Sequence, residues 1–302
     1  MTIKQPNTPW QPEINHETSL SDGYRNILIK RLQSLGKVLQ KHNKTNTLSP
    51  KLVHKIRVGS RRLICAIKLF KQVGSKKLLV KPLVRTKNLM DHFGPMRNWD
   101  VFYNACKTYN NQSTSENNNL FLQGAIWANQ NRFEKEAIIY MRAKADKLIS
   151  RLLKTSSKLF TTNNEPVSIS FFEWSKLSLM KIVDDFKNSI NTIAYSKEEL
   201  HAFRLKIKFL RYGLEIIGDV IPVETSHSLY DSLKKGQAIL GAINDLYFHI
   251  EQITFIDASL KNKSLEEGLL KKSFLKHCQQ LLETNIGLFR TWQESTKHLI
   301  EI

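Results

Sequence analysis

One pattern of residues occurs twice in this chain of 302 residues, and the two copies lie 147 positions apart. The first copy reads His54-x-x-Arg57-x-x-x-Arg61, and the second reads His201-x-x-Arg204-x-x-x-Lys208. The same offset relates Lys87 to Lys234, Gly94 to Gly241 and Asn98 to Asp245. Because the offset holds over about 40 residues without an insertion, the sequence predicts an internal duplication of one structural unit.

The spacing of apolar residues predicts that this unit is helical. Apolar residues recur every three or four positions, and no stretch shows the alternation that is typical of a β-strand. Only 12 glycines and 8 prolines interrupt the chain, which favours long helices. The sequence therefore predicts an all-α fold, with helices at 24–42, 50–73, 76–109, 120–160, 171–191, 197–218, 225–257 and 264–300. A break in the third helix is considered at Gly94-Pro95.

Polar segments predict how the helices are grouped. Residues 1–20 are polar and contain prolines, so they are expected to form a flexible N-terminal arm. Loops are predicted at 110–119 and 161–170, which are rich in Asn, Ser and Thr. The second loop is the predicted boundary between a first helical half at 21–160 and a second at 171–302.

The chain carries a large excess of positive charge. It has 46 lysines and arginines against 27 acidic residues, for a formal net charge of +19. Such an imbalance predicts a polyanionic partner: nucleic acid, an anionic membrane or a phosphate polymer. The sequence shows no apolar run of the ~18–20 residues that span a membrane, and no leader peptide is recognised. Its three cysteines are far apart, which disfavours a disulfide framework and favours a reducing, cytoplasmic location.

Part of this charge falls into one ordered stripe on each of two predicted helices. A helical wheel places His54, Arg57, Arg61 and Lys68 on one arc, and likewise His201, Arg204, Lys208, Arg211 and Tyr212. The apolar residues of both helices fall on other faces. No carboxylate is interleaved among the cations of either stripe, so they repel one another. A multivalent anion that relieves this repulsion is favoured over a merely solvated face.

The candidate contacts to such an anion follow from the stripes. Direct contacts are predicted for Arg57, Arg61, Arg62, Lys68, Arg204, Lys208 and Arg211. Lys87, Arg97 and Lys234 are second-rank candidates, and Lys30 and Arg31 are as readily explained by a solvated face. Tyr212 is predicted either to donate its hydroxyl to phosphate or to pack.

The two motif histidines allow three interpretations. His54 and His201 are predicted to contact phosphate, with a structural hydrogen bond as the first alternative and metal binding or catalysis as the second. No further ligands occur at metal-binding spacing, so neither a metal nor a cofactor is predicted. Short polar residues after the glycines, Asp100, Asn244 and Asp245, are interpreted as helix caps that orient arginines rather than as a metal site or general base.

At these residues the sequence resembles the CHAD family, the conserved-histidine α-helical domain, from about residue 20 to 295. The matching segments are 53–63, Phe93-Gly94-Pro95-Met96-Arg97-Asn98-Trp99-Asp100-Val101, His201-x-x-Arg204-x-x-x-Lys208-x-x-Arg211-Tyr212-x-x-Glu215, and 233–245. Two positions depart from the family pattern: Ile64 stands where an arginine is usual, and Asn98 where an aspartate is usual.

The resemblance implies two up-down helical bundles related by a pseudo-twofold axis, with the basic helices lining a shared positive surface or pore. It also implies binding of inorganic polyphosphate by a stand-alone domain that is not an enzyme, in the cytoplasm and with polyphosphate granules as one setting. Nucleic acid is the disfavoured alternative, because no aromatic residue alternates with the stripe to stack bases. A histidine- or metal-dependent enzyme of phosphate metabolism is the less favoured third reading.

Overall fold

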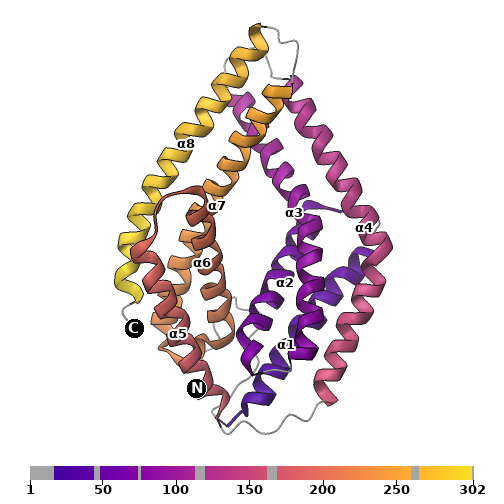
Figure 1. Cartoon of the computed structure of the whole chain (residues 1–302), viewed down its shortest axis with the longest axis vertical. Coiled ribbons are helices and arrows are strands. Elements are labelled where there is room, and N and C mark those ends of the chain that lie inside the picture. The colour runs from indigo at the N-terminus through magenta and orange to yellow at the C-terminus, as the bar shows by residue number, and fades with distance from the viewer. Residues whose placement is uncertain are drawn as a thin grey trace.

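The computed structural model describes residues 17–43, 48–73, 76–112, 120–161, 169–259 and 265–300. Within these ranges the chain forms eight α-helices and no β-strand, which confirms the all-α prediction (Figure 1). The helices are α1 (Leu20–Asn43), α2 (Pro50–Leu69), α3 (Lys76–Gln112), α4 (Leu120–Thr161), α5 (Phe171–Thr192), α6 (Lys197–Ile217), α7 (Val223–Ser259) and α8 (Leu265–Lys297). Short 3₁₀ turns follow α2, α6 and α8.

The break considered at Gly94-Pro95 does not occur, because α3 is continuous from Lys76 to Gln112. Proline lacks the backbone donor that an uninterrupted helix uses, and its ring crowds the preceding turn. Tertiary packing offsets this cost here. Phe93 and Met96, on either side of the Gly-Pro pair, are both buried in the main core.

The segments before α1 and before α5 meet each other. Ser19 and Ser170 form an isolated antiparallel bridge, and the amide of Phe171 donates to the carbonyl of Thr18 at 3.0 Å. Ser170 also begins α5 through a capping box with Glu173. Most of the predicted N-terminal arm (1–16), of the loop at 110–119 and of the boundary loop lies outside the described residues, and the division into two halves stays a prediction.

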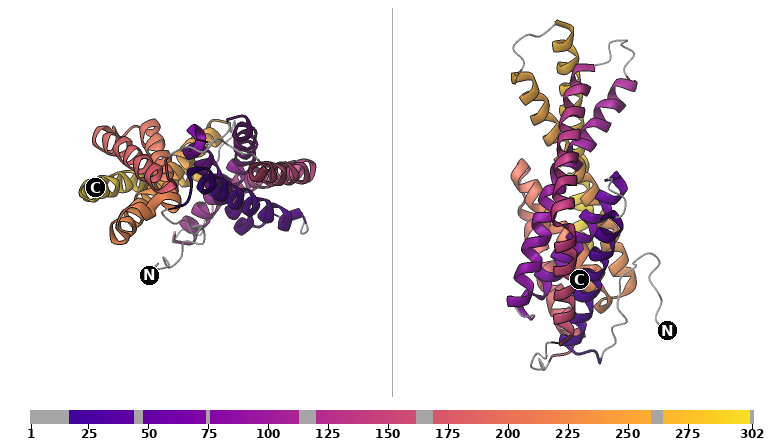
Figure 2. Two further views of the ribbon diagram at one scale, coloured as in Figure 1. Left: turned by 90° about the horizontal axis from the view of Figure 1, so that it is seen from below. Right: turned by 90° about the vertical axis from the view of Figure 1, so that its right-hand side faces the viewer.

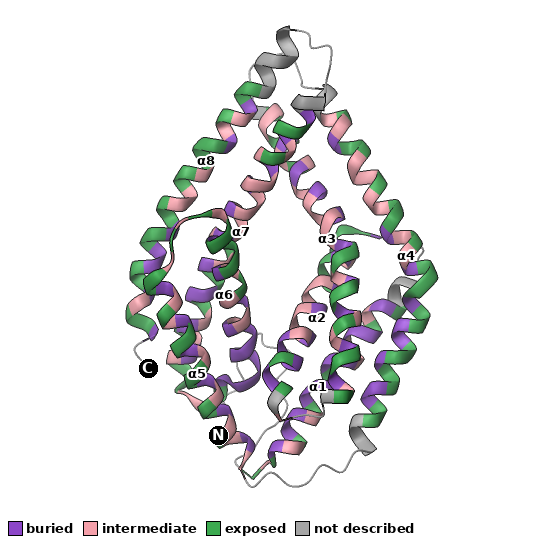
Figure 3. Cartoon of the chain, viewed as in Figure 1, coloured by how far each residue is buried: buried purple, intermediate pink, exposed green. Residues whose placement is uncertain are grey.

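Helices α1–α4 lie on one side of the molecule and α5–α8 on the other, with α2 and α6 on the inner side of each group (Figure 1). The longer helices α3, α4, α7 and α8 extend beyond the shorter ones toward one end, which makes the molecule elongated (Figures 1 and 2). In Figure 3, stripes of buried residues follow the helices while green exposed residues cover the outside. This arrangement brings the two helices that carry the repeated motif into contact.

Two hydrophobic cores hold the groups together. The main core contains residues from all eight helices and so crosses from one group to the other. A second, smaller core joins the extended ends of the long helices through Trp99 and Phe102 of α3, Ile126 of α4, Ile253 of α7 and Phe274 of α8. The two groups that meet at the α2–α6 contact are therefore held together both by the main core and by the smaller core at the ends of the long helices. The origin of the two groups by duplication stays a prediction.

Gly23 is required where α1 meets the start of α5, which gives a testable expectation for the fold. A Cβ atom there would lie 2.1 Å from Cδ2 of the buried Phe171 ring. Gly23→Ala should therefore lower the free energy of unfolding by about 1–3 kcal/mol, since an overpacked core must shift to make room. Urea denaturation followed by circular dichroism measures this loss.

Gly287→Ala on α8 is the matched control, because a Cβ at Gly287 meets nothing within 4 Å. That variant should gain about 0.5–1 kcal/mol through helix propensity alone. If Gly23→Ala were stabilised to the same extent, the close packing of α1 on Phe171 would be wrong.

Candidate anion-binding site

Five cations from both groups of helices come together where α2 faces α6. We call them the basic cluster: Arg57 and Arg61 of α2, Arg97 of α3, and Arg204 and Lys208 of α6. They interact electrostatically across the groups. The charge of Arg204 lowers the pKa of Arg57, and the charge of Arg61 lowers the pKa of Lys208. All five were candidates from the sequence, and the structure places them in one site.

The motif arginines lie against the repeated glycines. A Cβ on Gly94 would lie 3.6 Å from Nη1 of Arg57, and a Cβ on Gly241 would lie 3.4 Å from Nη2 of Arg204. Each guanidinium therefore crosses the following long helix of its own group where that helix has no side chain. The same contact occurs in both groups, which explains why the glycine and the arginine recur with one offset.

Burial and mutual repulsion destabilise the charged forms of these groups. Burial, followed by Arg61, Arg97 and Arg204, lowers the pKa of Arg57 to about 10. Lys208 is only 7% exposed, and burial together with its three arginine neighbours lowers its pKa to about 6, so an anion is needed to favour its charged form at neutral pH. In the described part of the chain none of the five cations takes part in a salt bridge, and Nε of Arg204 is buried without a hydrogen-bond partner. A multivalent anion would supply the missing partner.

One carboxylate, Asp245 of α7, faces the basic cluster. Burial raises its pKa, while Arg204, a hydrogen bond from Asn244, Arg97 and Lys208 act in the opposite direction. Asp100 of α3 is buried and accepts a hydrogen bond from Nε2 of Gln130 at 2.8 Å. These placements fit the interpretation that the short polar residues after the glycines orient neighbouring side chains.

Arg62 is in a different situation, because it has a carboxylate partner that its own helix did not reveal. Its Nε and Nη2 donate to the two oxygens of Glu215 at 2.8 and 3.0 Å, in a bidentate pair. Arg31 of α1 approaches the same carboxylate at 3.5 Å, and the Tyr230 hydroxyl donates to it at 3.2 Å. Arg62 was predicted as a direct contact to an anion, and its guanidinium is already paired with this carboxylate. A helical wheel could not find a partner 153 positions away on α6.

The remaining candidates lie outside the basic cluster. Lys68, Lys87 and Lys234 are exposed, and a contribution from them stays a prediction. The guanidinium of Arg211 lies over the rings of Tyr212 and Tyr230, at 4.6 and 5.6 Å from their centroids. Tyr212 itself is 3% exposed, which favours packing over a hydroxyl contact to an anion.

The two motif histidines have different surroundings. Partial burial, with Arg97, Arg61 and Arg57, lowers the pKa of His54. Nδ1 of His201 lies 2.9 Å from Oδ1 of Asn244, and because an amide oxygen accepts, the nitrogen donates. Among the residues with defined positions, no group of three or more His, Cys, Asp or Glu is placed to hold a metal ion.

The chain is thus an α-helical domain whose two helical groups face each other through a partly buried cationic site. The sequence model of the CHAD domain matches residues 30–253, and the chain belongs to that family. The fold is similar to the CHAD domain from the plant Ricinus communis, with a TM-score of 0.71, 18% identity and coverage of 93% of both chains. It is also similar to PptA from Streptomyces chartreusis, with a TM-score of 0.72, 9% identity, and coverage of 92% of this chain and 100% of the other.

A search of the curated proteins finds no match. Among the described helices, none is long and apolar enough to cross a membrane.

Glu215→Ala tests the buried ion group. Removing the carboxylate takes away the counter-charge that Glu215 supplies to Arg62 and to Arg31, whose side chain is 4% exposed. Breaking a buried pair in this way costs about 3–5 kcal/mol of unfolding free energy. The exposed pair of Glu294 and Lys297 provides the control, and Glu294→Ala should cost less than about 1 kcal/mol. Equal losses in urea denaturation would contradict a structural role for Glu215.

Lys208 makes stability depend on pH. Its pKa is about 6 in the folded protein, against the ordinary 10.5 for an unfolded chain, so unfolding takes up a proton between these values. The cost of burying this amine is full below pH 6, falls as the pH rises, and is absent above 10.5. Lys208→Met should therefore be more stable than the wild type at pH 6, and the difference should shrink at pH 9. A difference in urea midpoint that is equal at both pH values would contradict this assignment.

Proposed function

We propose that the basic cluster binds inorganic polyphosphate and that the protein does so without being an enzyme. The observation that carries this proposal is the set of four arginines and one lysine, from both groups of helices, that share one partly buried site without a salt-bridge partner in the described part of the chain. Forced proximity of like charges is costly, so such a site favours a ligand with many negative charges and little bulk.

A bare phosphate polymer fits this site better than nucleic acid does. The tyrosines nearest to Arg211 do not offer stacking faces, since Tyr212 is buried and the hydroxyl of Tyr230 is bonded to Glu215. Sequence-tolerant binding of single strands depends on a row of such faces on which successive bases stack. Polyphosphate needs only donors and charge, and the CHAD family to which the chain belongs is associated with its binding.

The donors suit a linear anion. Arginine presents a planar fork that grips two oxygens, whereas lysine acts as a compact point charge. Arg57 and Arg61 are one turn apart on α2, as Arg204 and Lys208 are on α6, so each helix advances about 5.4 Å between donors. Two facing rows of this kind can hold successive phosphates from both sides. Binding should strengthen with polymer length and weaken steeply with salt, because each neutralised phosphate releases counterions.

Arg57→Glu combined with Arg204→Glu tests the proposal. Retention of long-chain polyphosphate in a filter-binding assay at near-physiological salt should be abolished, since each substitution places a carboxylate among the phosphate donors. Neither arginine has a salt-bridge partner in the described structure, so the melting temperature should change little. A large loss of helicity would instead show that the cluster is structural.

The matched control is Lys272→Glu with Lys276→Glu, which makes the same change in net charge on exposed residues of α8. This control should keep most of the retention, because bulk charge adds mainly to long-range steering. Failure of the wild type to retain polyphosphate would overturn the proposal.

Two further outcomes would favour the alternatives. Displacement of polyphosphate by single-stranded nucleic acid at equal phosphate concentration would favour the nucleic-acid alternative. Release of phosphate in the presence of Mg²⁺ that is lost in His54→Ala would favour an enzyme.

A further inference from the structure

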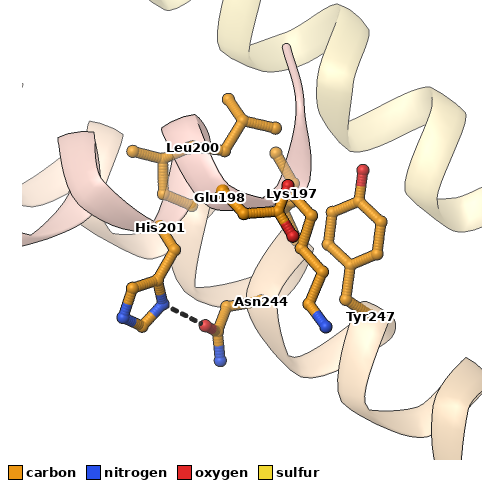
Figure 4. Close-up of a pocket in the computed structure, with 8 residues that line it drawn as sticks. Lys197, Glu198, Leu200, His201, Asn244 and Tyr247 are labelled. Atoms are coloured by element: carbon orange, nitrogen blue, oxygen red, sulfur yellow. Dashed lines mark hydrogen bonds between the residues drawn. The ribbon is translucent and has the colours of Figure 1, made fainter.

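A pocket of about 280 Å³ lies beside the basic cluster, between the first turns of α6 and the middle of α7 (Figure 4). Its lining residues are Lys197, Glu198, Leu200, His201, Leu240, Ile243, Asn244 and Tyr247. His201 is the only lining residue that belongs to the repeated motif. The pocket is smaller than a typical drug-sized site and matches a single flat ring system.

The walls of this pocket do not suit a bare phosphate. Leu200, Leu240 and Ile243 are buried apolar residues, and Tyr247 contributes an aromatic face. The lining lysine, Lys197, is already paired with Glu251, and its ammonium lies 6.0 Å from the centroid of the Tyr247 ring. Apolar walls with one aromatic face favour a flat organic ring over an anion.

The polar groups at the edge are hydrogen-bond acceptors. Nδ1 of His201 donates to Asn244, and in this tautomer of the imidazole Nε2 is an acceptor. The exposed carboxylate of Glu198 is a second acceptor. Figure 4 shows His201 and Asn244 at one side of the pocket, with Glu198, Lys197 and Tyr247 toward the other. A ring that carries N–H donors, such as an aminopurine, complements this edge.

The residues that line the pocket are followed on both helices by residues of the cationic site. Arg204 follows His201 by three residues on α6, so the two side chains are neighbours on one face of the helix. On α7, Asn244 is followed by Asp245, which interacts with Arg204 and Lys208. A ligand whose ring fills the pocket would therefore present an anionic tail to Arg204 and the rest of the basic cluster.

We propose that this pocket takes the purine base of a nucleoside polyphosphate, with the phosphate chain of that ligand lying on the basic cluster. The inference rests on the proposed function, because it uses the same cations for the phosphates. It also makes the ligand more specific, because the site would accept a phosphate chain that carries an aminopurine nucleoside at one end.

The other group of helices lacks an equivalent pocket lining. By the offset of 147, Asn244 corresponds to Arg97 and Tyr247 to Asp100, which is buried and bonded to Gln130. A cation replaces the amide, and an acid replaces the aromatic face. The chain therefore binds one nucleoside end and not two, so we expect a stoichiometry of one nucleotide per chain.

Isothermal titration calorimetry with ATP, inosine triphosphate and inorganic tripolyphosphate, all with a metal chelator, tests the inference. The decisive variant is Tyr247→Leu, which removes the aromatic face and keeps an apolar side chain. ATP affinity should fall about tenfold in this variant, the size expected for a lost base stack, while tripolyphosphate affinity stays unchanged. Inosine triphosphate lacks the exocyclic amino group and should bind the wild type about fivefold more weakly than ATP.

Phe255→Leu on α7 is the control, because Phe255 is an exposed aromatic residue that does not line the pocket. It should change neither affinity. Equal losses for ATP and tripolyphosphate in Tyr247→Leu, or equal binding of ATP and inosine triphosphate, would overturn the pocket assignment and leave the proposed function standing. ATP binding that depends on Tyr247, in a protein that retains no long-chain polyphosphate, would overturn the proposed function and leave the pocket standing.

Discussion

Like charges are held close together where α2 packs against α6, and the rest of the fold has to maintain that contact. Lys208 is nearly buried among Arg57, Arg61 and Arg204, an arrangement that burial and Coulomb repulsion both oppose. The two hydrophobic cores supply the opposing free energy, because both include helices from each group. The site is therefore kept ready for an anion by packing elsewhere, and a bound polyanion would relieve repulsion that the empty site already contains.

A second electrostatic interaction joins the two groups of helices, and this one is an attraction between opposite charges. Glu215 of α6 holds Arg62 of α2 and Arg31 of α1, so an acid from one group neutralises two cations from the other. The offset of 147 pairs Glu215 with Lys68, and Arg211 with Ile64. The two groups of helices thus differ at the positions where they contact each other. Ile64 and Lys68 of α2 stand where α6 has Arg211 and Glu215.

The sequence alone predicted the features that depend on residues close to one another along the chain. Apolar spacing predicted the helices, and the helical wheel predicted that Arg57, Arg61, Arg204 and Lys208 share equivalent faces, because both follow from 3.6 residues per turn. Contacts between helices distant in sequence were not accessible in this way. The pair of Arg62 with Glu215 and the bond from His201 to Asn244 depend on how α2, α6 and α7 pack. The uninterrupted course of α3 through Pro95 likewise depends on tertiary packing that overrides local propensity.

The two groups of helices place different side chains at the two ends of the site. Arg97 adds a cation beside His54, whereas the equivalent position beside His201 is Asn244, followed by the carboxylate of Asp245. The side near His54 is lined mainly by arginines, and the side near His201 combines Arg204 with an amide and the apolar pocket, while Asp245 interacts with arginines of both groups. An inorganic polyphosphate chain has no direction and gains nothing from this asymmetry. A phosphate chain that ends in a ring does gain from it, because its two ends find different partners, and for this reason we place the nucleoside end at α6 and α7.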